Sequence, residues 1–211
     1  MMKSNPFAPT NGRLDDDDDE CDKDKDGEKG GVAMLGQRLL KKRVVMVTKP
    51  VDRDLMAATV AQLLVLDSES HDPITMYINC PGGDADSGFG IYDVMRFVAS
   101  PITTVCTGLA ASAAIIIFLG GDKGSRFSMP NSRFLIHQPS TQSQGQASDL
   151  EITANEIIKT RDKYNGIIED ETGVKADAIV TDAHRDFWLS AQEAVDYKLV
   201  DKLVANRAEL G

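Results

Sequence analysis

Short apolar runs alternate along the chain with longer segments in which apolar residues recur every three or four positions. Residues 44–47, 74–78 and 102–106 have the length and composition of buried strands. The segments between them form two amphipathic helices, with apolar positions Met56, Val60, Leu63 and Leu64 in the first and Ile91, Val94, Met95 and Val98 in the second. This alternation predicts an α/β fold of repeated βαβ units with a mainly parallel sheet.

Small residues follow two of the predicted strands. Gly82 and Gly83 end the second strand, where glycine permits backbone angles closed to other residues and a close approach of an N–H group to a ligand. After the third strand, mostly small residues at 106–114 precede the apolar run 115–119, which predicts a tight turn and then a buried helix. Ser112 is expected in the first turn of that helix, where free N–H groups favour a developing negative charge.

A serine nucleophile needs a base, and the chain has three histidines. His71 lies in a polar turn and is expected to be solvated. His137 follows a short apolar strand at 133–136, and His184 leads into the apolar pair 187–188. By themselves these patterns leave both His137 and His184 open as the base.

A long helix is predicted from about residue 148 to residue 170. Ser148 and Glu151 have the spacing of a capping box at its start. Its apolar residues lie roughly along one stripe: Leu150, Ala154, Ile157, Tyr164 and Ile168. A single stripe on so long a helix requires a partner surface. A second capping box, Ser190 with Glu193, predicts the last helix.

The first 33 residues differ in composition from the rest of the chain. Residues 15–29 hold ten acidic and three basic residues, a net charge of −7 out of −10 for the whole chain. We expect residues 1–33 to be a disordered acidic tail, since the charged run has too few apolar residues to offset chain entropy, and no secretory signal, since no apolar segment follows Met1. Residues 34–211 then form one domain of ordinary size.

Cysteine and apolar content exclude several classes of protein. Cys21, Cys80 and Cys106 show no paired spacing, which argues against a zinc site and fits reduced thiols in the cytoplasm. The longest apolar run falls well short of the roughly 18 residues that span a membrane. We expect no metal, no bound cofactor, and neither a membrane nor a nucleic acid as partner.

Several ordered motifs carry a resemblance to a known family. They include Gly108-Leu109-Ala110-Ala111-Ser112, Ile136-His137-Gln138-Pro139, Tyr77-Ile78-Asn79-Cys80-Pro81-Gly82-Gly83 and Arg185-Asp186-Phe187-Trp188-Leu189-Ser190. The segment 38–44 matches the first strand of that family. From about residue 34 to residue 204 the chain resembles the proteolytic subunit of the Clp protease, a serine peptidase with a crotonase-like spiral fold and a protruding handle helix.

The resemblance implies a role for each matching position. Ser112 would be the nucleophile, His137 the base and Asp186 the acid that orients it. The N–H groups of Gly83 and Ala113 would form the oxyanion hole.

The same resemblance implies an assembly and its partners. We expect two stacked seven-membered rings, formed by this chain alone or together with a second Clp proteolytic subunit. The rings would hydrolyse unfolded proteins supplied by an AAA+ unfoldase, which uses the ATP. Two alternatives stay open here: a structural or regulatory ring subunit that does not cleave by itself, and a crotonase-like acyl-CoA enzyme without such a triad.

Overall fold

The computed structural model describes residues 34–140 and 142–210. The chain divides into two units between Arg38 and Leu39, and the fold described below is that of the second unit. The predicted disorder of residues 1–33 lies outside the described residues. The boundary predicted at residue 34 therefore stays a prediction.

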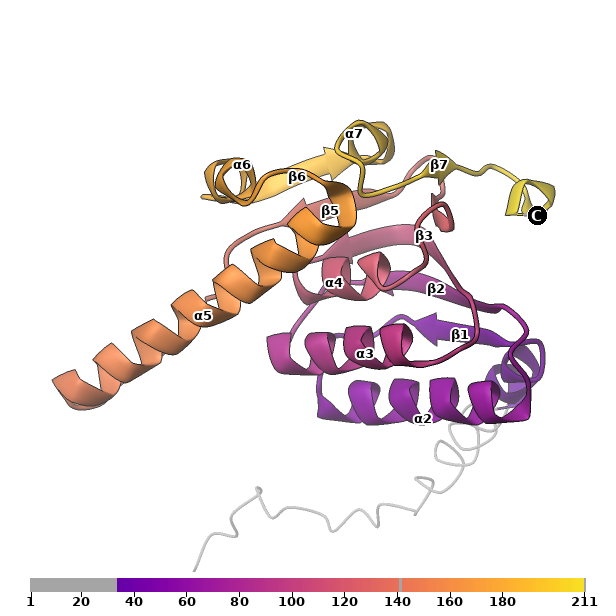
Figure 1. Cartoon of the computed structure of the whole chain (residues 1–211), viewed down its shortest axis with the longest axis horizontal. Helices are drawn as coiled ribbons and strands as arrows, with labels where there is room; N and C mark the ends of the chain where they lie inside the picture. Colours follow the sequence, from indigo (N-terminus) through magenta and orange to yellow (C-terminus); the bar gives the residue numbers. More distant parts are fainter. Residues whose placement is uncertain (1–33, 141, 211) are drawn as a thin grey trace, which may run out of the picture. The chain divides into compact units, whose positions relative to one another are not determined.

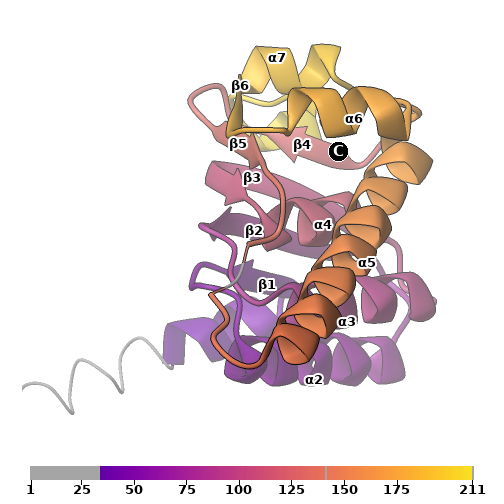
Figure 2. The ribbon, with the colours of Figure 1, turned by 90° about the vertical axis from the view of Figure 1, so that its left-hand side faces the viewer.

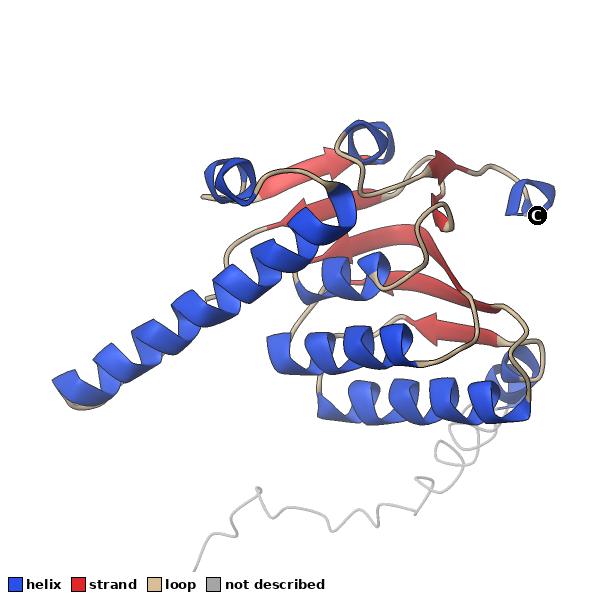
Figure 3. Cartoon of the chain, in the orientation of Figure 1, coloured by secondary structure: helices blue, strands red, loops and turns tan. Residues whose placement is uncertain are grey.

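Seven strands form one mixed sheet (Figures 1 and 3). They are β1 (Val44–Val47), β2 (Ile74–Cys80), β3 (Ile102–Ala111), β4 (Arg126–Ser128), β5 (Arg133–Ile136), β6 (Phe187–Ser190) and β7 (Lys202–Leu203). All neighbouring strands are parallel except β5 and β6, which confirms the predicted α/β fold with a mainly parallel sheet. The sheet divides at β3, whose first part pairs with β4 and whose last part pairs with β5.

Helices cover one side of the first three strands, as Figure 2 shows for α2, α3 and α4. The helices are α2 (Arg53–Glu69), α3 (Ala85–Phe97), α4 (Ala113–Leu119), α5 (Ala147–Thr172), α6 (Ala176–Asp182) and α7 (Ala191–Asp196), followed by a 3₁₀ turn at Arg207–Leu210. Alternate residues of β1 and β2 are buried, and the residues between them are partly or fully exposed, among them Met46 at 42%. On that opposite face, Tyr77 packs against a small second cluster of Val105, Phe127 and Val204.

Helix α2 begins after Asp52, whose side chain can cap a helix and whose Oδ1 accepts a hydrogen bond from the Leu55 N–H at 2.8 Å. The predicted stripe is wrong at one position: Leu64 is 43% exposed. The buried positions of the helix are Thr59, Leu63 and Leu66. A small rotation of the helix about its axis accounts for the difference, since both sets keep helical spacing.

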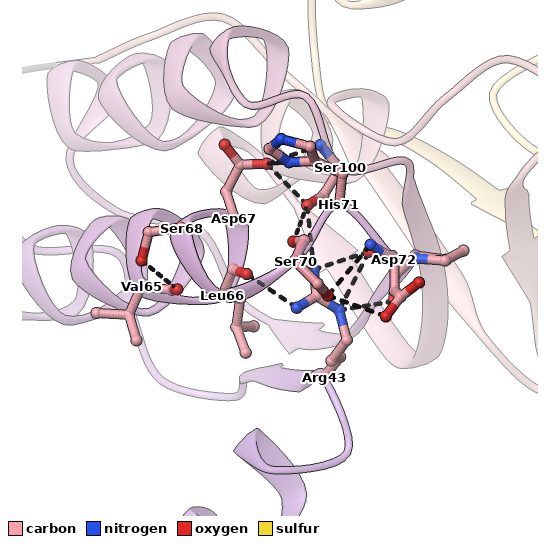
Figure 4. Close-up of polar contacts among 10 residues, drawn as sticks. Arg43, Val65, Leu66, Asp67, Ser68, Ser70, His71, Asp72 and Ser100 are labelled. Carbon is pink, nitrogen blue, oxygen red and sulfur yellow. Dashed lines mark hydrogen bonds and ion pairs between the residues drawn. The ribbon is translucent and has the colours of Figure 1, made fainter.

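The segment 38–44 is not one strand, contrary to expectation. Residues 34–40 are helical, residues 41–43 form a turn, and the strand begins only at Val44. Arg43 has a left-handed φ of 57°, and its guanidinium donates to the carbonyls of Leu66, Ser70 and Asp72 (Figure 4). The side chain thus caps the end of α2, and this fixed turn prevents the strand from starting earlier.

The 26-residue helix α5 is longer than predicted, and its predicted capping box is wrong. The helix is preceded by Gln146, without a side-chain cap, so Ser148 already lies in its first turn. Its last turns pack on the core through buried residues that include Tyr164 and Ile168. The first turns extend beyond the other helices (Figure 1), and there Ile152 is 62% and Ile158 45% exposed.

An ion pair fixes the end of α5 to the sheet. The Arg126 side chain on β4 is 2% exposed and pairs with Glu171, which is 7% exposed. Tyr92 on α3 donates a hydrogen bond of 2.8 Å to the same carboxylate. Burial alone would raise the pKa of Glu171, but the hydrogen bonds from Arg126 and Tyr92 outweigh it and hold the pKa below its ordinary value. Three elements are therefore joined around one charged group.

Candidate active site

Ser112 occupies the junction between β3 and α4. The strand continues to Ala111 and the helix begins at Ala113, so Ser112 precedes the helix instead of lying in its first turn as predicted. Its φ of 55° and ψ of −124° are rare for a residue with a side chain and cost on the order of 1–3 kcal/mol. The serine hydroxyl does not cap the helix. It is therefore not used to stabilise the helix that follows.

Small residues permit this sharp turn. A Cβ placed on Gly82, whose φ is 86°, would lie 2.7 Å from the Ser112 Cβ and 2.4 Å from the Ala111 carbonyl oxygen. The Ser112 N–H donates to the Leu135 carbonyl at 2.9 Å, which ties the junction to β5. On the other side, the buried Tyr164 hydroxyl of α5 donates to the Ser112 carbonyl at 3.2 Å.

Gly83 and Ala113 present free backbone donors beside Ser112. Gly83 has a φ of 148°, and a Cβ there would lie 2.2 Å from the Val51 carbonyl oxygen. Val51 bonds to the neighbours of Gly83 instead, donating to the Gly82 carbonyl and accepting from the Asp84 N–H, both at 2.8 Å. Within residues 34–140 and 142–210, the N–H groups of Gly83 and Ala113 donate to no other protein group. Both remain available to a bound oxygen.

His137 and Asp186 flank one residue pair of the sheet. Ile136 of β5 lies opposite Phe187 of β6 in the antiparallel register, so His137 directly follows one member and Asp186 directly precedes the other. The His137 Nδ1 lies 3.8 Å from the Asp186 Oδ1. The imidazole is 31% exposed and the carboxylate 65%. The pairing of β5 with β6 brings these two side chains together, and the sequence analysis did not predict it.

One open cleft of about 540 Å³ contains both Ser112 and His137. Its lining also includes Gly83 and Ala113, together with apolar side chains of three helices: Phe89, Ile116, Ile157 and Tyr164. His184 lies in a separate shallow hollow with His137 and Asp186, and it does not line the cleft of Ser112. Of the two histidines that the sequence pattern left open, His137 is the one that shares a cleft with Ser112.

The five residues expected at the site thus lie together around one cleft and its edge. The sequence pattern did not point to the hydroxyl of Tyr164, which it placed only on an apolar stripe. A buried tyrosine hydroxyl needs a hydrogen-bond partner. A tyrosine on a stripe expected to be buried is therefore the sequence signal that could have identified this contact. Burial raises the pKa of this hydroxyl well above its ordinary value, so it stays a hydrogen-bond donor.

Neither a metal site nor a membrane-spanning helix is found among the described residues. Within the described residues, no three histidine, cysteine or acidic side chains gather in a way that could hold a metal ion. None of the helices in the described ranges is both long and apolar enough to cross a membrane. Burial raises the pKa of Cys80 and of Cys106, both fully enclosed, so these thiols are kept protonated.

The site combines a serine at a strained strand–helix junction, a histidine in the same cleft and two free backbone N–H groups. These features are typical of a serine hydrolase on an α/β fold. Residues 27–207 match the Clp protease family. The chain is 44% identical over 181 residues to the ATP-dependent Clp protease proteolytic subunit 2 of Treponema pallidum, a match that covers 85% of this chain and 91% of the relative.

A solved structure agrees with this result. A mutant of ClpP1 from Listeria monocytogenes superposes with a TM-score of 0.78 at 40% identity, covering 84% of this chain and 99% of that one. The chain belongs to the Clp protease family, as a proteolytic subunit of the ATP-dependent Clp protease and a serine peptidase. This membership decides against the acyl-CoA alternative.

Proposed function

We propose that Ser112, His137 and Asp186 form the catalytic triad of this peptidase, with the Gly83 and Ala113 N–H groups as its oxyanion hole. The observation that carries the proposal is the common cleft: Ser112, His137, Gly83 and Ala113 all line it. Each chemical role that peptide hydrolysis requires is then filled by a group at the same edge of the sheet.

In the first step the Ser112 Oγ attacks the carbonyl carbon of the peptide and its proton passes to the His137 Nε2. The His137 Nδ1 faces Asp186, so the other ring nitrogen is the one free to act on the serine. The negative charge that forms on the substrate oxygen is stabilised by the Gly83 and Ala113 N–H groups. The C–N bond then breaks, the leaving amine takes the proton from His137, and an acyl-enzyme remains.

In the second step a water molecule attacks the acyl-enzyme. His137 accepts a proton from that water as the new C–O bond forms, and then returns it to the Ser112 Oγ as the ester bond breaks. The carboxylic acid product leaves and the enzyme is restored. The open cleft with its apolar helix walls suits an extended, unfolded polypeptide, and we propose unfolded proteins as the substrate.

The proposal extends to assembly. We propose two stacked seven-membered rings joined through α5, formed by this chain alone or together with a second, different Clp proteolytic subunit in the cytoplasm. The exposed apolar residues Ile152 and Ile158 on the extended part of α5 support a contact there, because large apolar side chains on a protruding helix favour burial against a partner. An AAA+ unfoldase would feed the rings and hydrolyse the ATP.

Comparison of the parent with Ser112→Ala on a fluorogenic peptide tests this function. The variant should lose hydrolysis by about 10⁶-fold, while native mass spectrometry shows the same particle. Turnover by the purified variant at the parental rate contradicts the assignment of Ser112. An inactive parent that becomes active only on mixing with a second Clp subunit supports the regulatory alternative instead.

A further inference from the structure

Tyr164 makes a contact at the site that the triad and the oxyanion donors do not include. It lies on α5, is 5% exposed, and donates its hydroxyl to the Ser112 carbonyl oxygen at 3.2 Å. The same carbonyl also accepts the Ile115 N–H at 2.9 Å, within the first turn of α4. The oxygen is therefore held from two directions, one of them supplied by a different element of the fold.

That carbonyl and the Ala113 N–H belong to a single peptide unit. The six atoms of a peptide unit lie in a plane, and in the trans form the C=O and N–H point in opposite directions. A group that holds the Ser112 oxygen consequently also sets the direction of the Ala113 hydrogen. Without Tyr164, only the hydrogen bond from the Ile115 N–H would hold this peptide plane. The plane lies at the end of a short helix and next to a residue with strained backbone angles.

We propose that Tyr164 is a positioning residue for the reaction, whose hydroxyl fixes the peptide plane 112–113 and so aims the Ala113 N–H at the substrate oxyanion. The inference rests on the proposed function of Ser112 and Ala113. A donor aimed in advance contributes to catalysis because it needs no reorganisation when the charge forms. The hydroxyl itself touches neither the reacting atoms nor the base.

Tyr164→Phe removes this one oxygen and keeps the ring that packs in the core. The matched control is Tyr92→Phe, which removes the hydroxyl of another partly buried tyrosine, one that bonds to Glu171 at 2.8 Å away from the cleft. For Tyr164→Phe we expect kcat on a fluorogenic peptide to fall by about 3- to 10-fold, the effect of one hydrogen bond. KM should change by less than about twofold, and Tyr92→Phe should keep the parental kcat.

Two binding measurements separate positioning from simple loosening of the site. A peptide aldehyde forms a tetrahedral adduct with the serine, so its affinity should fall in Tyr164→Phe by the same factor as kcat/KM. Binding of the uncleaved peptide to Ser112→Ala should be unchanged when Tyr164→Phe is added, since the ground state does not depend on the oxyanion donor. Both results together support the role of Tyr164.

Three results overturn it: a parental kcat in Tyr164→Phe, a raised KM with unchanged kcat, or an equal fall of kcat in both tyrosine variants. The second would mean that Tyr164 only lines the cleft. A parent that neither hydrolyses the peptide nor binds the aldehyde would overturn the proposed function itself. A parent that does both, combined with any of the three results above, would overturn only the role of Tyr164. Native mass spectrometry and thermal unfolding establish that each variant is folded and assembled.

Discussion

His137 and Asp186 are brought together by one pair of residues in adjacent antiparallel strands, and the His137 Nδ1 lies 3.8 Å from the Asp186 Oδ1. This separation is longer than the 2.7–3.2 Å of a typical N–H···O hydrogen bond. The carboxylate is 65% exposed, so no wall of the described unit forces it toward the ring. The strand pairing therefore fixes the backbone positions of the two residues but not the orientation of the exposed Asp186 carboxylate.

Asp186→Ala should lower kcat by about 10³- to 10⁴-fold with little change in KM, because the imidazole loses the group that sets its orientation and stabilises its charged form. Steady-state kinetics on a fluorogenic peptide measures both constants. Asp177→Ala, an exposed carboxylate in the first turn of α6, is the control and should behave as the parent. A parental kcat for Asp186→Ala would remove the residue from the triad.

Gly83→Ala should reduce kcat by about 10²- to 10³-fold, the usual effect of losing one oxyanion donor. The added Cβ meets the Val51 carbonyl at 2.2 Å, so the backbone must move and the N–H with it. Gly124→Ala is a matched control, because Gly124 also has a left-handed φ, of 90°, but open space for a Cβ. If both variants retain parental kcat in the same assay, the Gly83 N–H does not serve the reaction.

Ile152→Glu or Ile158→Glu should reduce the size of the particle, since a charge on the exposed part of α5 opposes burial against another subunit. Ile168 is unsuitable for this test because it is fully buried in the core of its own unit. Sedimentation velocity compares the variants with Ile152→Leu, which keeps the apolar surface. Identical sedimentation of Ile152→Glu and Ile152→Leu would place the contact elsewhere.

Glu171→Gln should lower the melting temperature at pH 7 by about 10 °C, because it leaves the buried Arg126 without its partner at a cost of about 3–5 kcal/mol. The folded-state pKa of Glu171 lies below its ordinary value of 4.5, so the charged form stabilises the fold above that pH. The stabilisation is lost as pH falls through the lowered pKa.

The melting difference between Glu171→Gln and the parent should therefore shrink below about pH 4.5. Glu169→Gln on the same helix removes a surface pair with Lys175, and it should shift the melting temperature by no more than about 2 °C. Calorimetry at equal protein concentration measures all three proteins. A constant difference from pH 7 to pH 3 would show that the Glu171 charge does not contribute to stability.

The spacing of apolar and capping residues along the chain predicted the elements that have a clear signal of their own. The strands β1, β2 and β5, the helices α2 and α3, and the capping box of Ser190 with Glu193 on α7 all form where their spacing indicates. The predicted end of β3 at residue 106 was too early, because small residues such as Ala110 and Ala111 give no strand signal of their own. They are kept in the strand by pairing with β5, which is a non-local contact.

Non-local pairing also explains the elements that the pattern missed. β4 and β6 are short, and each exists because a neighbouring strand provides its hydrogen bonds. The site depends on such pairings: β3 with β5 sets Ser112 near His137, and β5 with β6 sets His137 near Asp186. Spacing along the chain could locate Ser112, Gly83 and Ala113 next to turns. Only the resemblance to a family could assign Asp186 in advance.

Covalent labelling tests the catalytic assignment most directly. The purified protein is treated with a fluorophosphonate, and the modified residue is located by peptide mapping with mass spectrometry. The reagent should add to a single serine, Ser112, and His137→Ala should slow the reaction by orders of magnitude, because the hydroxyl then lacks its base. Labelling of a different serine, or labelling of Ser112 at an equal rate with and without His137, would contradict the proposed triad.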